Sequence, residues 1–554
     1  MGSQSPYSPK KTCGACHDYD QITKGYHFQQ GRLDGSGKIA VSDTFDPQTP
    51  GSLSSGLYGK YSPLSPDASL LSRKTNRTFS EMDRSTFFYV RNCGPCHPGG
   101  GWAEFDRRGN PYYDPSKRKF GYEFFGEPPH LDGDYTPFSG GHENYGAPWD
   151  RSGVNEADCL ICHLPGYRWK ERAAFLRAGL FRYGPAAGAG WATFKPPSPQ
   201  TPEAQTGSPR IDYTNKEVAD FENLHVQIVR RPPSENCWSC HAPYGEKKRG
   251  YEWSPETDVH RARGMECVSC HPGNKEHQIA KGDSLSLTVR DDLDQTMPSC
   301  EDCHYKRRDR KAPRPRHPFS PRHLRRIACQ TCHLPYRSLS AELVYDHTTG
   351  ETRIYETSDF IPSAGARSPL WYPGLRNFKG KIVPVKPALP IYWGDLDEKR
   401  NVVRPIPLWK IREMKKPPLR DDNGDGVPEV NSLEEIRSFL LALKGRDRFG
   451  NPIAELPVLL KGGFLYRLDK KGAVEKIPHD RARPTDLSLN HNVRPGSLAL
   501  GAKGCKECHV RNSPFFLRKI LVDPYDEKGK AVYVEAWEWM GIERERLGRL
   551  LLEQ

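Results

Sequence analysis

The cysteines of this chain follow a single repeated pattern. All sixteen fall into eight C-x-x-C-H motifs, numbered 1 to 8 in chain order. Two thiolates at this spacing can add to the two vinyl groups of one porphyrin, and the adjacent histidine can then ligate its iron. The pattern therefore predicts eight covalently attached haem c groups. The predicted attachment residues are Cys13, Cys16, His17, Cys93, Cys96, His97, Cys159, Cys162, His163, Cys237, Cys240, His241, Cys267, Cys270, His271, Cys300, Cys303, His304, Cys329, Cys332, His333, Cys505, Cys508 and His509.

Other uses of paired cysteines fit this pattern poorly. A disulfide framework needs no histidine after each pair, and a zinc ribbon uses two C-x-x-C pairs for one metal. A thioredoxin-like redox motif occurs once rather than eight times. Haem attachment is the interpretation that uses every cysteine together with every adjacent histidine.

Eleven histidines lie outside the motifs, enough to give each predicted iron a second axial ligand. Histidines close to a motif are favoured, because they can reach the iron of a neighbouring haem. Two imidazole ligands lower the reduction potential relative to Met/His ligation. Three histidines are set aside, namely His130, His317 and His347. The predicted distal ligands are His27, His142, His225, His260, His277, His323, His479 and His491.

The chain contains few of the apolar residues that usually form a protein core. Only 36% of the residues are apolar, and glycine and proline number 50 each in 554 residues. Porphyrins are large apolar bodies, so the cofactors are expected to supply much of the core. We predict a mostly irregular and α-helical, haem-scaffolded multihaem cytochrome with short helices. A haem-free insert with some β-strand is expected before the last haem.

The formal net charge of +13 is expected to be balanced within the holoprotein. Eight haems would add about sixteen negative propionates, partly offset by ferric iron. The densest basic run, Lys306 to Arg326, holds ten basic residues and one acid, Asp309. Arginine suits pairing with propionates, so we predict no nucleic-acid partner. A docking surface for a redox partner is the alternative use of this run.

The spacing of the motifs divides the chain. Motifs 4 to 7 are separated by only 25, 28 and 24 residues, whereas 171 residues lie between motifs 7 and 8. Short connections should hold neighbouring porphyrins close together. We predict an N-terminal three-haem region at 1–235, a dense four-haem cassette at 236–335, a haem-poor insert with strands at 336–500, and the eighth haem with a C-terminal helix at 501–554.

The insert contains a second pattern that can bind a metal. Residues 421–426 read DDNGDG and match the start of a calcium loop, with Gly426 at its sharp turn. Ser432 stands where such a loop usually has a glutamate, and Glu434 or Glu435 is a substitute. A polar turn without metal is the alternative. The predicted calcium ligands are Asp421, Asn423 and Asp425.

The cellular location follows from the cofactor. Haem attachment of this kind takes place outside the cytoplasmic membrane, so an extracytoplasmic protein made from an exported precursor is expected. The first eleven residues lack the pattern of a secretory signal, which predicts that the signal has been removed. No apolar run approaches membrane-spanning length, so membrane association is expected only through partners.

Three segments resemble known multihaem cytochromes. Residues 258–271 (DVHRARGMECVSCH) and 325–335 (RRIACQTCHLP) are similar to stretches of octahaem cytochromes of anaerobic respiration and extracellular electron transfer, including octahaem tetrathionate-reductase-like proteins. Residues 512–530 resemble segments after the last haem in cytochromes of metal-reducing bacteria. Octahaem tetrathionate and nitrite reductases carry one C-x-x-C-K motif at the catalytic haem, whereas all eight motifs here end in histidine.

These observations favour an electron carrier over an enzyme, and no catalytic residue is assigned. The expected function is conduction of electrons along closely packed bis-histidine haems between redox partners. Those partners are other redox proteins, or copies of the same chain in a conductive filament. The alternative is an oxidoreductase acting on nitrogen or sulfur oxyanions at one haem with an open axial position.

Overall fold

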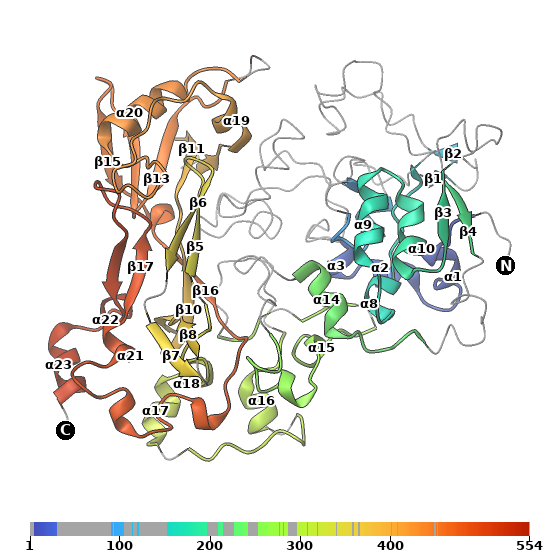
Figure 1. Ribbon diagram of the computed structural model, residues 1–554, viewed down its shortest axis with the longest axis horizontal. Helices are drawn as coiled ribbons and strands as arrows, with labels where there is room; N and C mark the ends of the chain where they lie inside the picture. Colours follow the sequence, from blue (N-terminus) through green and yellow to red (C-terminus); the bar gives the residue numbers. More distant parts are fainter. Residues whose placement is uncertain are drawn as a thin grey trace. The chain divides into compact units, whose positions relative to one another are not determined.

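The structure is a computed structural model of the 554-residue chain (Figure 1). It describes residues 5–29, 90–91, 94–104, 113–114, 119–120, 152–196, 209–213, 227–241, 253–275, 277–280, 282–285, 296–306, 308–317, 319–339, 341–356, 359–363, 366–399, 402–406, 408–447, 450 and 452–552.

The chain divides into two compact units. The first comprises Met1–Phe45, Lys74–Tyr251 and Glu266–Lys281, and the second comprises Asp46–Arg73, Glu252–Met265 and Gly282–Gln554. Motifs 1 to 5 belong to the first unit and motifs 6 to 8 to the second. The segment expected to form one four-haem cassette is thus shared between the units, and the four-region organisation stays a prediction.

Short helices provide most of the regular structure described in the first unit. Its longest helices are α9 (Trp169–Arg177) and α14 (Ser234–His241), and a left-handed Gly190 with φ of 72° ends α10. The strands form two small antiparallel pairs. The elements are α1 (Pro9–Thr12), α2 (Tyr19–Thr23), α3 (Tyr26–Gln29), η3 (Gly101–Glu104), β1 (Tyr113–Asp114), β2 (Lys119–Phe120), α8 (Leu160–His163), α9, η5 (Phe181–Tyr183), α10 (Gly184–Ala189), β3 (Thr193–Lys195), β4 (Arg210–Asp212), α14 and α15 (Cys267–Cys270).

The second unit combines short helices with antiparallel sheets (Figure 1). Its helical elements are η6 (Arg261–Arg263), α16 (Cys300–His304), α17 (Pro321–Arg326), α18 (Cys329–His333), α19 (Leu408–Glu413), α20 (Leu433–Ala442), η7 (Asp480–Ala482), η8 (Gly496–Leu498), η9 (Cys505–Glu507), α21 (Pro514–Leu517), α22 (Ala536–Trp539) and α23 (Arg544–Leu552). The strands form a five-stranded sheet in the order β12-β11-β13-β14-β15, a three-stranded sheet in the order β16-β10-β9, and the hairpins β5–β6, β7–β8 and β17–β18.

The bounds of these strands are β5 (Ala341–Asp346), β6 (Glu351–Glu356), β7 (Asp359–Ser363), β8 (Ala366–Leu370), β9 (Gly374–Phe378), β10 (Lys381–Ala388), β11 (Tyr392–Asp397), β12 (Val402–Pro405), β13 (Pro457–Lys461), β14 (Phe464–Leu468), β15 (Val474–Pro478), β16 (Thr485–Ser488), β17 (Lys519–Asp523) and β18 (Val532–Glu535).

Aliphatic and aromatic side chains build the core of the haem-poor insert. Helix α20 packs against β13, β14 and β15 and buries Ile436, Phe439 and Leu440. The rings of Trp393 and Phe439 stack with centroids 5.3 Å apart. This stretch therefore has a hydrophobic core of its own that needs no haem.

The predicted fold class agrees with the structure in its main features. Short helices, several small sheets and long irregular connections are present, and strands lie in the insert before motif 8. Haem scaffolding stays a prediction. Across the described ranges, no helix combines the length and apolar character needed to cross a membrane.

Candidate haem sites

Each described haem motif sits on a short helical turn. In motifs 1, 3, 5 and 8 the backbone N–H of the histidine donates to the carbonyl of the first cysteine, at 2.9 to 3.1 Å. Residues at positions i, i+3 and i+4 share one face of such a turn. Both thiols and the imidazole are therefore placed on the same side, as attachment to one porphyrin requires.

Several of the described motif histidines are oriented by their second ring nitrogen. In five of them Nδ1 lies within hydrogen-bonding distance of a backbone carbonyl, which can only accept, so Nδ1 carries the proton and Nε2 presents a lone pair. This is the usual arrangement of a metal-ligating histidine. The pairs are His163 with Val229 at 2.7 Å, His304 with Pro313 at 2.8 Å, His271 with Ala280 at 2.9 Å, His333 with Arg494 at 3.0 Å, and His509 with Leu550 at 3.0 Å.

Burial favours the neutral form of two of these imidazoles. Desolvation lowers the pKa of His163 and of His271 below the usual value for histidine, and the carbonyl bond of each ring opposes the shift. A neutral imidazole is the form that ligates a metal. Electrostatics and geometry therefore agree that these rings suit iron.

Among the residues that the structure describes, five motif histidines each face a second histidine at a similar distance. Two metal–nitrogen bonds of about 2 Å and two ring radii of about 1 Å place the centroids of two imidazoles on one metal roughly 6 Å apart. The observed separations are 6.0 Å for His27 and His241, 6.1 Å for His277 and His163, 6.1 Å for His323 and His509, 6.2 Å for His260 and His304, and 6.4 Å for His317 and His333. Each pair has the spacing of two axial ligands of one haem iron.

Two of the facing histidines are themselves held in place. His260 Nδ1 lies 3.3 Å from Oδ1 of the buried Asp258, and His277 Nδ1 lies 3.0 Å from the carbonyl of Lys275. His277 also adopts a left-handed backbone with φ of 54°. This conformation is uncommon outside glycine and is typical of functional sites.

The structure thus brings four of the eight predicted distal ligands, His27, His260, His277 and His323, to a motif histidine. It also brings His317, which the sequence analysis set aside. His142, His225 and the motif cysteine Cys93 lie outside the described residues. Of the other two predicted ligands, the ring of His491 lies 6.5 Å from that of Trp253, and His479 follows β15 at the edge of the five-stranded sheet.

Cysteines of different motifs also lie in contact. The thiols of Cys13 and Cys159 share a hydrogen bond that lowers the pKa of Cys13 to about 6, and a bond to Cys300 lowers the pKa of Cys329 to about 7. A third bond joins Cys237 and Cys267 and raises the pKa of Cys237. These thiols stand where thioether sulfurs would be in the holoprotein. Motifs 1 and 3, 4 and 5, and 6 and 7 are therefore adjacent.

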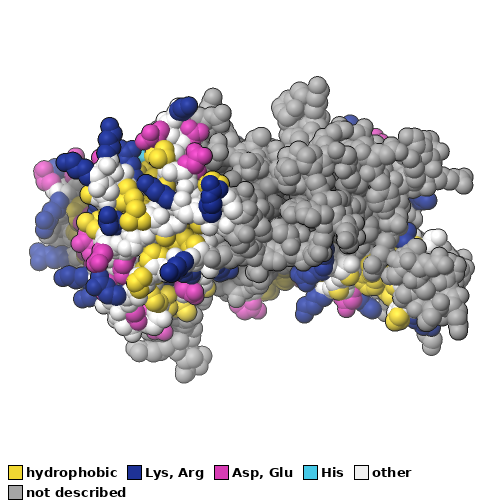
Figure 2. All heavy atoms as spheres, turned by 90° about the horizontal axis from the view of Figure 1, so that it is seen from above, with side chains coloured by type: hydrophobic (Ala, Val, Ile, Leu, Met, Phe, Trp, Pro, Cys, Tyr) yellow, Lys and Arg dark blue, Asp and Glu magenta, His cyan; other side chains and the backbone are white. Residues whose placement is uncertain are grey.

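The basic run from Lys306 to Arg326 lies among three motifs of the second unit. The Pro313 carbonyl accepts from the motif 6 histidine, while His317 faces motif 7 and His323 faces motif 8. Several of its arginines are exposed, namely Arg308, Arg310, Arg314, Arg316, Arg322, Arg325 and Arg326. On the face shown in Figure 2, Lys and Arg side chains are interspersed with Asp and Glu.

The candidate calcium loop brings three carboxylates together. Ligand atoms of Asp421, Asp425 and the buried Glu429 lie within 4.8 Å of one another. Glu429 accepts from the side chain of Asn423 at 2.6 Å and from the backbone N–H of Asp422 at 3.0 Å. Burial raises its pKa, against the hydrogen bond and a nearby arginine. The sequence analysis missed Glu429, although it stands at the ninth position of the loop.

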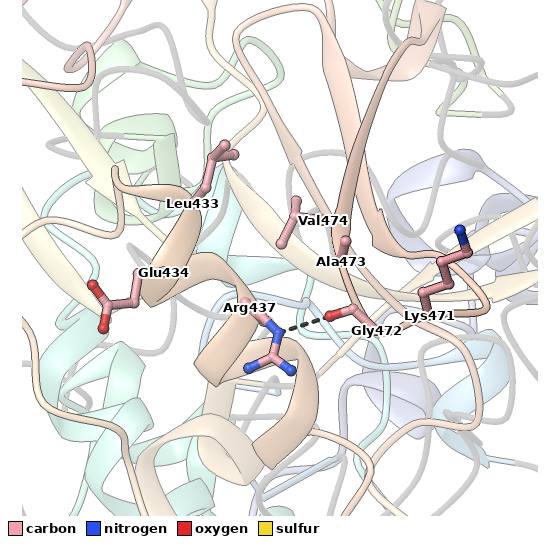
Figure 3. Close-up of a pocket in the computed structure, with 7 residues that line it drawn as sticks. All are labelled: Leu433, Glu434, Arg437, Lys471, Gly472, Ala473 and Val474. Atoms are coloured by element: carbon pink, nitrogen blue, oxygen red, sulfur yellow. Dashed lines mark hydrogen bonds between the residues drawn. The ribbon is translucent and has the colours of Figure 1, made fainter.

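The two glutamates considered as substitute ligands lie elsewhere. Glu435 and Ser432 form a capping box at the start of α20, and Glu435 is also 3.7 Å from Arg420. Glu434 lines a shallow cleft between α20 and the turn before β15, where Arg437 donates to the Gly472 carbonyl at 2.7 Å (Figure 3). The residues lining this cleft belong to no haem motif.

The motifs, the oriented imidazoles and the ring pairs define the class: the chain is a multihaem c-type cytochrome with covalently bound haem c. A family model described as cytochrome c554 and c-prime matches residues 209–272, which include motifs 4 and 5. The chain is also similar to the solved octaheme cytochrome c from Shewanella oneidensis, at 16% identity over 92% of each chain and a TM-score of 0.35. Among curated proteins, none matches the chain at a significant level.

Proposed function

We propose that the protein is an extracytoplasmic octahaem electron carrier, in which all eight motifs hold haem c. It conducts electrons between redox partners along closely packed haems, each ligated by two histidines. The observation that carries this proposal is the set of five histidine ring pairs, each spaced for one iron between its members.

The residues of the chain hold the cofactors and leave the iron no free position. Bound haem c supplies an iron that alternates between the ferric and ferrous states. The motif cysteines tether it, and the carbonyl bonds to Nδ1 set the plane of the proximal ring. With haem bound, the distal imidazole would occupy the remaining position on iron and would exclude water and small substrates. Bis-histidine ligation also favours a low reduction potential.

The distal ligands connect motifs that are distant in sequence. His27 follows motif 1 but faces the histidine of motif 4, and His277 follows motif 5 but faces that of motif 3. A segment that carries one haem and ligates another holds the two close together. With the contacts between cysteines, this arrangement supports a continuous path within each unit.

Location and partners follow from the same chemistry. Covalent haem attachment takes place outside the cytoplasmic membrane, so we place the protein in the periplasm, on the cell surface or in the exterior. Its partners are redox proteins or further copies of the chain, and membrane association occurs only through such partners. A polymer with haems meeting across copies is a variant of the same function.

Haem counting and redox titration of the purified holoprotein test this function. Mass spectrometry should find eight haems per chain, one on each motif, and titration should show low potentials throughout. An electron that enters at one haem should reach the other haems of the chain before an oxidant removes it. Fewer haems, or turnover of nitrite, hydroxylamine, sulfite or tetrathionate at a haem that binds them, would contradict the electron-carrier function.

A further inference from the structure

A fully buried arginine of the first unit joins motif 2 to motif 3. Arg172 lies on α9, and its side chain has no exposed surface. Nη1 donates to the carbonyls of Gly94 and Pro95 at 2.5 and 3.0 Å, and Nη2 donates to that of His97 at 3.1 Å. The guanidinium therefore binds three carbonyls of the motif 2 segment, including that of its iron-ligating histidine.

The remaining bond of Arg172 reaches the residue directly before motif 3. Its Nε donates to Oδ2 of Asp158 at 3.0 Å, and Asp158 is also fully buried. The hydroxyl of Tyr167 donates to the same carboxylate oxygen. The backbone N–H of Asp158 donates to the Pro98 carbonyl at 2.7 Å, so a second bond joins the two motif segments.

Close packing leaves little freedom at this junction. A side chain at Gly94 would meet the Val90 carbonyl and the Leu176 side chain well inside van der Waals contact. The indole N–H of Trp169 donates to the Pro95 carbonyl at 2.6 Å. The motif 2 segment is thus pressed against α9, and Arg172 holds it there by hydrogen bonds to its backbone.

A buried ion pair contributes little net stability to a protein core. Desolvating both charges costs about as much as their attraction returns, and well-packed apolar residues are often at least as stabilising. Next to a haem, the ion pair of Arg172 and Asp158 also affects the reduction potential of the iron. A fixed positive charge raises the potential of a nearby iron, and the carboxylate compensates for it.

We propose that Arg172 is a positioning residue for electron transfer between the haems of motifs 2 and 3. The inference rests on the proposed function, since it needs haem at both motifs. Arg172 fixes the distance and orientation of the two porphyrins through the backbone of motif 2. The carboxylate of Asp158 neutralises the charge of Arg172, so that the ion pair adds no net charge near the two irons.

Two conservative variants test this role with potentials and rates as readouts. Arg172→Lys keeps the charge but cannot bind four acceptors in the geometry of a guanidinium. It should keep its haems, and electron equilibration between motifs 2 and 3 should slow at least tenfold. Asp158→Asn leaves Arg172 uncompensated, so two haem potentials should rise by about 59 mV or more, a tenfold change in a one-electron equilibrium. Arg177→Lys, an exposed change on the same helix, is the control.

The outcomes separate this inference from the proposed function. Peptide mapping of the wild-type protein must find haem on motifs 2 and 3, and its absence overturns both proposals. If both variants carry the full haem complement with wild-type potentials and rates, Arg172 is only a structural residue and the inference falls. If Arg172→Lys fails to attach its haems, the haem reduction potentials of Asp158→Asn decide whether the inference holds.

Discussion

The imidazole rings of His317 and His333 lie with centroids 6.4 Å apart and planes inclined by 72°. His333 belongs to motif 7, and its Nδ1 bonds to the carbonyl of Arg494. Burial and the neighbouring His333 lower the pKa of His317, which favours the neutral ring. The two rings suit one iron between them.

Replacing His317 should therefore open a single haem. His317→Ala should convert one low-spin ferric haem to high spin, and His317→Met should raise one potential, because Met/His ligation has a higher potential than bis-histidine ligation. Optical and electron paramagnetic resonance spectra provide the measurement. Arg316→Gln, at the exposed neighbouring residue, should leave all spin states unchanged. Wild-type spectra in His317→Ala would exclude this residue as a ligand.

The expected proximal residues of each described site can be read from the sequence alone, because a C-x-x-C-H motif is local. The distal ligands stay a prediction, because the path of the chain in space decides which histidine reaches which haem. His317 lies in a proline-rich basic run with no helical pattern around it, yet it faces motif 7. His323 in the same run was favoured because a histidine just before a motif can reach a neighbouring haem, and its ring lies 6.1 Å from that of His509 in motif 8.

A glycine divides one of the predicted elements. The C-terminal region of the chain was expected to contain one helix, but α22 and α23 are separate, because Gly541 between them adopts φ of 69°. Glu429 was missed because the interpretation rested on the first six positions of the calcium loop and on the twelfth, whereas Glu429 stands at the ninth. The cluster with Asp421 and Asp425 is visible only when the loop is folded.

Calcium should stabilise the haem-poor insert if the loop from Asp421 to Glu429 binds it. Calcium at a hundredfold excess over its Kd should add about 2.7 kcal/mol to the free energy of unfolding. Asp425→Asn should abolish this gain, whereas Glu434→Gln, on the exposed face of α20, should not. Thermal melts with calcium and with chelator give the comparison. Protein without bound calcium whose melting does not respond to added calcium would leave the loop as a polar turn.

Acid should destabilise the β5–β6 hairpin through His347, which lies buried in its turn. Burial, with the nearby Arg412, lowers the pKa of His347 from 6.5 to about 3. Between these values the unfolded chain binds a proton that the folded chain does not. The free energy of unfolding therefore falls as the pH falls through this window, by up to about 1.4 kcal/mol per pH unit.

Hydrogen exchange of peptides from β5 and β6 between pH 6.5 and 4 measures this local stability, after correction for intrinsic exchange. His347→Gln should have a flatter dependence than the wild type, because it has no group to protonate. The same slope in both proteins would assign the acid sensitivity to other groups.

Arginines of the basic run should tune the potentials of nearby haems if they pair with propionates. Replacing Arg314 and Arg316 with glutamine removes two positive charges and should lower at least one potential of motifs 6 to 8 by about 59 mV. Lys470→Gln with Lys471→Gln removes two charges from the turn before β15 and serves as the control. Unchanged potentials, with slower and more salt-sensitive reduction by a redox partner, would assign these arginines to docking.

Electron paramagnetic resonance of the fully oxidised protein tests the electron-carrier account most directly. If every haem has two histidine ligands, all eight ferric irons should be low-spin and six-coordinate. Nitrite, hydroxylamine, sulfite and cyanide should then leave the spectrum unchanged. A high-spin ferric signal equivalent to one iron per chain, which shifts when one of these ligands is added, would contradict the account and identify an open haem.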